Sequence, residues 1–156
     1  MRMIRASMLA AAMLSPAVAW PVDVALVVHP SNQTRDLRWE DVLAMFRAER
    51  QHWKGGRKIY LILPEAGTPE REIVLRRVYR MTDVQLKQFW LGKLYRGEIA
   101  AYPRVVASSA AARRLVSHAS NALAFIDAAA IDATVKVVRI DGRRPGDPGY
   151  RLDAGP

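Results

Sequence analysis

The hydrophobic positions of this chain fall into short continuous runs that alternate with segments of helical spacing. The apolar run from Ile59 to Leu63 is typical of a strand covered on both faces. Between Trp39 and Phe46 the apolar residues recur at i, i+3, i+4 and i+7, which predicts an amphipathic helix. We expect strands at 22–29, 59–63, 104–107, 121–127 and 135–140, and helices at 38–48, at 69–80, from Thr82 or Asp83, and from Ser108 or Ser109 to 116. This order predicts an α/β layered domain.

The segment between the second strand and the second helix is the first candidate for chemistry. A glycine turn, Pro64 to Pro69, leads from the strand into the helix, where Thr68 can cap the first turn. The amides at the start of a helix form a ready anion site. Most strand–glycine–helix turns bind nothing, so an ordinary turn stays the competing interpretation of this loop.

The amino-terminal residues have the pattern of an export signal. Arg2 and Arg5 supply positive charge, Met8 to Leu14 an apolar stretch, and 17–19 a small-x-small cleavage motif. We therefore expect residues 1–19 to be a signal peptide cleaved after Ala19, and a soluble product in the periplasm. No later segment approaches the roughly 20 apolar residues of a membrane span, so no stable membrane insertion is expected.

Length and composition limit the number of domains, the kind of partner and the chemistry that the chain can have. Residues 20–140 are long enough for a single domain, and the Gly/Pro-rich tail at 141–156 is expected to be loosely ordered. The formal net charge of +9 falls to about +7 without Arg2 and Arg5, which favours anionic partners. Export makes nucleic acid an unsuitable partner. The absence of cysteine excludes disulfides, thiolate metal sites and cysteine nucleophiles.

The sequence offers no catalytic constellation. His29, His52 and His118 lie on separate predicted elements without metal-ligand spacing, so no metal site or other cofactor is expected. The serines near His118 lack the strained turn that presents a nucleophile. Glu40 with Asp41 and Glu70 with Glu72 fall in the first turns of predicted helices, where carboxylates favourably meet the helix dipole. We expect a protein without enzymatic activity.

Several short motifs occur in a recognisable order along the chain. They are the turn at 27–32, the segment 53–59, Ala66-Gly67-Thr68, Phe89-Trp90, Tyr95-Arg96-Gly97, 121–126 and Gly149-Tyr150-Arg151-Leu152. With these motifs the sequence resembles the phosphate-binding proteins of bacterial ABC importers, and especially their short, single-lobe relatives. The resemblance implies a periplasmic-binding-protein-like type II lobe with a mixed sheet flanked by helices.

The resemblance also implies a ligand and a site. Ala66, Gly67 and Thr68 occupy the place of the family's phosphate-binding Ser-Gly-Thr turn, and Arg71 is the nearest cation. We expect weak binding of phosphate or another small anion there, by helix-terminal amides and the Thr68 hydroxyl. Because one lobe provides half of a two-lobe site, a homo-oligomer, a transporter or another periplasmic protein could supply the rest. The alternative is a non-catalytic protein-interaction module that has lost ligand binding.

Overall fold

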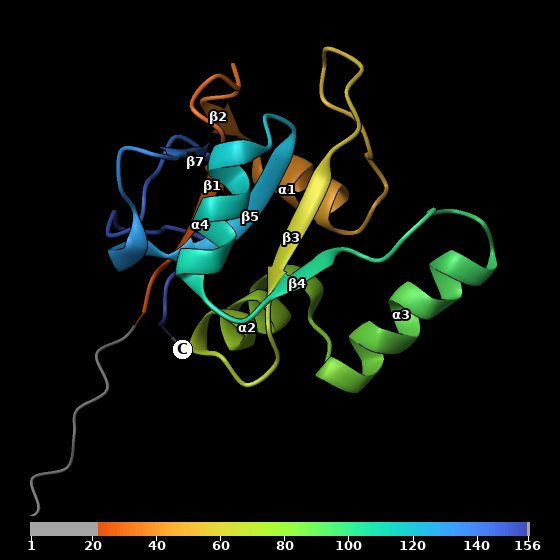
Figure 1. Ribbon diagram of the computed structural model, residues 1–156. Coiled ribbons are helices and arrows are strands. Elements are labelled where there is room, and N and C mark those ends of the chain that lie inside the picture. Colours follow the sequence, from red (N-terminus) through yellow and green to blue (C-terminus); the bar gives the residue numbers. More distant parts are fainter. Residues whose placement is uncertain (1–21, 156) are drawn as a thin grey trace, which may run out of the picture.

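A mixed five-stranded sheet forms the centre of the protein. The computed structural model describes residues 22–155 (Figure 1). The strand order is β4-β3-β5-β1-β6; β3 runs parallel to β4 and β5, whereas β1 is antiparallel to β5 and β6. This arrangement confirms the predicted α/β fold with a mixed sheet. The strands are β1 Val24–Val28, β3 Tyr60–Pro64, β4 Arg104–Val106, β5 Ala122–Asp127 and β6 Lys136–Val137.

Helices cover both faces of this sheet. One core cluster joins alternate residues of the strands to α1, α2 and α3, and a second joins the other strand faces to α4 (Figure 1). The continuous apolar runs predicted for two-sided burial are explained by these two layers. The helices are α1 Trp39–Phe46, α2 Pro69–Val74, the π-helical η1 Leu75–Tyr79, α3 Asp83–Tyr95, α4 Ser109–His118 and the 3₁₀ turn η2 Ala128–Ala130.

The last predicted strand, 135–140, is divided between two sheets. Its first part is β6, while β7 (Arg139–Ile140) pairs in parallel with the short strand β2 (Asp36–Leu37), which the sequence does not predict. Val138 lies at the break, fully buried, and its amide donates to the Leu26 carbonyl at 2.9 Å.

The predicted helix 69–80 changes geometry halfway. It begins as α2 and continues as η1, which ends at Arg80 in the left-handed conformation (φ 54°). The wider π turn places Leu75, Val78 and Tyr79 in the core. Such turns occur mostly as single-turn insertions, as here.

The segment after Asp141 is not loosely ordered, contrary to the expectation from its composition. Tyr150 and Leu152 are buried, and the Tyr150 hydroxyl donates to the Val24 carbonyl at 2.9 Å. The Val24 amide in turn donates to the Leu152 carbonyl at 3.0 Å. Two apolar side chains and backbone pairing with β1 therefore hold a segment whose glycines and prolines alone suggest a free tail.

The expected signal peptide, 1–19, lies outside the described residues and stays a prediction. In the part of the chain that the structure describes, the longest helix is α3, and none is both long and apolar enough to cross a membrane.

Candidate functional site

The predicted anion loop follows β3 at the carboxyl end of the parallel strands. Ligands of α/β proteins commonly bind at this edge of the sheet. The Glu65 amide donates to the Val106 carbonyl of β4 at 2.9 Å, which ties the start of the loop to the neighbouring strand. Gly67 has φ +84°, a conformation that side chains rarely adopt, so glycine is required for this turn.

Thr68 caps α2 as the sequence predicts. Its hydroxyl oxygen accepts from the Arg71 amide at 3.2 Å, and its proton goes to the Glu65 carbonyl at 2.8 Å. Both functions of the hydroxyl are therefore used inside the loop. In this arrangement Thr68 shapes the turn, and its side chain has no proton left to donate to a ligand.

Arg71 points into the protein. The whole arginine residue is only 9% exposed. Its Nε donates to Asp83 Oδ1 at 2.8 Å, and one terminal nitrogen donates to the Pro64 carbonyl at 3.0 Å. Asp83 is the first residue of α3, so the arginine connects the end of β3 with the start of α3. The charge expected to attract an anion is already paired with a carboxylate.

Tyr79 lies in the same charged surroundings. Burial raises the pKa of Tyr79 far above its usual value, although the positive charges of Arg71 and Arg47 act in the opposite direction. The neutral hydroxyl donates to the Phe46 carbonyl at 2.7 Å. This buried hydrogen bond connects the end of η1 with the end of α1.

A small hollow of about 180 Å³ separates the starts of α2 and α4. Ser109 Oγ donates to the Glu70 carboxylate at 2.8 Å and accepts from the Asp127 amide at 2.8 Å. Ser108 caps α4 by accepting from the Ala111 amide at 3.1 Å. Because the Glu70 carboxylate lines this hollow, its negative charge opposes the entry of a second anion.

The four predicted residues lie close together in the sequence but do not line a single hollow. Thr68 borders the hollow that contains Glu70, whereas Ala66 and Arg71 border a larger, mainly apolar one of about 500 Å³ beside α3 and β4. Ala66 and Gly67 are exposed, and within residues 22–155 their amides donate to no other group. These two amides are the part of the predicted site that is open to a ligand.

Sequence reasoning missed three residues that decide what this loop can do. They are Asp83, Glu70 and Ser109. Each lies at a predicted helix start and so had a local explanation, but their partners are 12 residues (Asp83 with Arg71) and 39 residues (Ser109 with Glu70) away along the chain. Within the described residues, no group of three His, Cys, Asp or Glu side chains could hold a metal ion.

Comparison with known proteins supports the fold. No protein-family model matches this chain, and no curated protein matches it. Among solved structures, an ABC-type phosphate transport receptor from Vibrio cholerae has a TM-score of 0.69 at 21% identity, over 85% of this chain and 54% of that one. PstS from Borrelia burgdorferi gives 0.66 at 12% identity, over 85% and 55%.

The chain thus spans about half the length of the solved proteins that it matches. The chain has the fold of a single type II periplasmic-binding-protein lobe.

Proposed function

We propose that this chain is an exported, non-catalytic solute-binding lobe that takes a small oxyanion, with phosphate as the reference ligand, at the turn between β3 and α2. One observation carries the proposal: the adjacent amides of Ala66 and Gly67 are exposed and unpartnered in a chain with the fold of phosphate-binding lobes. Backbone amides are strong donors to oxyanions. Thr68 and Arg71 would act by holding the turn in shape.

The expected affinity is low. A tight oxyanion site would combine several donors with an uncompensated cation, and here Arg71 is paired with Asp83. The nearby Glu70 carboxylate adds a repulsive charge on one side. A second lobe, from another copy of the chain or from a transporter component, would have to supply further donors.

The test is a phosphate titration at constant ionic strength with two readouts, the melting temperature and the amide NMR spectrum. Phosphate should raise the melting temperature, because a ligand selective for the folded state stabilises it, and should shift the Ala66 and Gly67 resonances first. Ala66→Glu places a carboxylate beside the two amides and should abolish both effects. Ala133→Glu makes the same change of charge at another exposed alanine and should leave them intact. Equal responses in the two variants, or none in the wild type, would contradict the proposal.

A protein-interaction module is the second candidate function, and a specific surface favours it. Leu91, Tyr102 and Val105 are exposed large hydrophobic residues around the 500 Å³ hollow, and β4 is the edge strand of the sheet. Exposed apolar patches and free sheet edges are common sites of association. Val105→Lys should then abolish co-purification of a protein partner while phosphate binding at Ala66 and Gly67 persists.

A further inference from the structure

A third hollow lies at the opposite end of β3 and β5 from the turn between β3 and α2. It has a volume of about 680 Å³, and we call it the basic hollow. Four of its lining residues are cations, Arg35, Arg50, Lys54 and Arg57. They come from the segment that follows β1 and from the one that precedes β3, which rise on the same side of the molecule in Figure 1.

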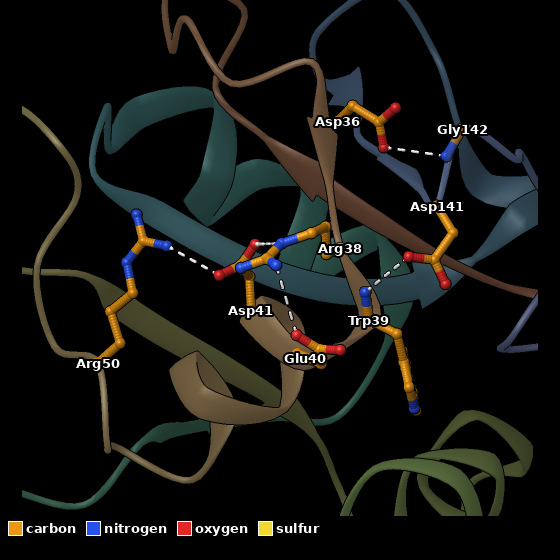
Figure 2. Close-up of polar contacts among 8 residues, drawn as sticks. All are labelled: Asp36, Arg38, Trp39, Glu40, Asp41, Arg50, Asp141 and Gly142. Atoms are coloured by element: carbon orange, nitrogen blue, oxygen red, sulfur yellow. Dashed lines mark hydrogen bonds and ion pairs between the residues drawn. The ribbon is translucent and has the colours of Figure 1, made fainter.

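The acidic residues on this hollow are already engaged. Asp41 lies between two arginines, with Arg38 Nε at 3.2 Å and an Arg50 terminal nitrogen at 3.4 Å (Figure 2). The hydrogen bond from Arg38 is the main reason that the pKa of Asp41 lies below its usual value. Asp36 accepts from the Gly142 amide at 3.1 Å. The neutral amide leaves the charge of Asp36 in place, so the lining holds four cations against two carboxylates.

Three cations on the hollow have no acidic partner within residues 22–155. Arg35 and Lys54 contact no carboxylate, and Arg57 donates to the neutral hydroxyl of Ser120. Lys136 adds to the positive charge beside Arg35: its Nζ donates to the Asn32 carbonyl, and burial, then the charge of Arg35, lowers its pKa. The cations on the lining thus outnumber its two carboxylates, and the hollow has a net positive charge.

The segments that carry these cations are held by the fold. The amide of Arg139, the first residue of β7, donates to the Arg35 carbonyl at 3.0 Å. On the other side, Trp53 Nε1 donates to the Asn121 carbonyl at 3.0 Å, and its amide donates to the Arg57 carbonyl at 2.8 Å. Because the backbone is fixed on both sides, the cations face the hollow without the entropy loss of ordering a free loop.

We propose that the basic hollow binds a small anion that carries two or more adjoining phosphate groups, such as an inorganic oligophosphate. Guanidinium groups pair with phosphate oxygens in a two-pronged geometry, and ammonium groups meet them as point charges. The hollow is larger than the one beside Thr68, and its cations come from separate segments, so several phosphate groups can be met at once. This binding is independent of the loop at Ala66 and Gly67.

Isothermal titration of the purified chain with inorganic tripolyphosphate, against orthophosphate at equal ionic strength, tests the proposal. The double variant Arg35→Gln, Lys54→Gln should weaken tripolyphosphate binding roughly tenfold for each cation removed, because each loses a charge-assisted contact. The matched control, Arg104→Gln with Arg114→Gln, removes the same charge at exposed positions away from the hollow and should change the affinity less than threefold.

Amide NMR gives the location independently of affinity. Tripolyphosphate should shift resonances of residues 31–36 and 53–57 and leave Ala66 and Gly67 in place. Both variants should melt as the wild type does without ligand, since none of the four side chains makes a polar contact within the described residues. Absence of tripolyphosphate binding, an equal loss in the two double variants, or shifts confined to the 64–68 loop would overturn the proposal.

Discussion

The ion pair between Arg71 and Asp83 provides the sharpest test of how the candidate loop is built. We consider Arg71→Met, which keeps the length and much of the apolar volume of the side chain but removes its charge and its donors. The arginine connects the Pro64 carbonyl at 3.0 Å with Asp83 at 2.8 Å, and its side chain is 11% exposed. The substitution therefore breaks two contacts of a buried charged group.

The expected cost follows from these two contacts. Hydrogen bonds to charged groups contribute about 1.5–3 kcal/mol each. Asp83 has a side chain 37% exposed, so water can solvate it after the change, and methionine retains apolar contacts. We therefore expect a net destabilisation of about 2–4 kcal/mol rather than the full sum. For a domain of this size, that corresponds to a melting temperature lowered by roughly 6–16 °C.

Urea denaturation of the wild type, Arg71→Met, Asp83→Asn and the double variant measures both the cost and its origin. The double-mutant cycle should give a coupling energy of about 1–2 kcal/mol between the two residues. Arg114→Met, at an exposed helical position, serves as control and should cost less than about 0.5 kcal/mol. If Arg71→Met were as stable as the control but lost phosphate binding, Arg71 would be a ligand residue, and our structural interpretation would be wrong.

Three further outcomes follow from single contacts. Tyr150→Phe should destabilise by about 1–2 kcal/mol in thermal unfolding, because it leaves the Val24 carbonyl without its buried donor, whereas Tyr95→Phe, at 83% exposure, should be neutral. Thr82→Ala removes the capping box of α3 and should lower its stability by about 1 kcal/mol, seen as faster amide exchange in the first turn. The pKa of Asp41 is lower in the folded than in the unfolded protein, so ionised Asp41 stabilises the fold above about pH 4, and this stabilisation is lost as the pH falls through the folded pKa. Asp41→Asn should therefore reduce the loss of stability below about pH 4 in acid denaturation. The reduction should be less than about 1 kcal/mol, because Arg38 is exposed to solvent.

The parts of the fold that the sequence predicts are those set by local patterns. Five apolar residues with β-branched members place β1 and β3 within two residues of their observed ends. The caps were also visible, since Thr68 and Thr82 precede their helices with the expected spacing. In both cases the determining contacts lie within a few residues along the chain, so the sequence contains the information directly.

Contacts between distant segments account for what the sequence did not predict. Gly/Pro-rich composition suggested a loose tail, but Leu152 is buried against β1, about 130 residues earlier in the chain. The turn between β3 and α2 lies where the sequence predicts a turn, whereas the inward direction of Arg71 depends on Asp83. Asp83 has its own local explanation as the first residue of a helix, so the sequence does not indicate the pairing. The basic hollow likewise arises only when segments near Arg35 and Lys54 come together in space.

The paired state of Arg71 bears on how a single lobe of this fold could bind an oxyanion. The turn has Gly67 at φ +84° and two amides without a partner among the described residues. The nearest cation, Arg71, is already hydrogen-bonded to Pro64 of β3 and Asp83 of α3. Amides provide direction and hydrogen bonds, whereas selectivity for a doubly charged ion also requires net positive charge nearby. That charge has to come from outside this loop. In the proposed function the missing charge and donors come from a second lobe, and the affinity measured on the isolated chain is then a lower bound on that of the assembled site.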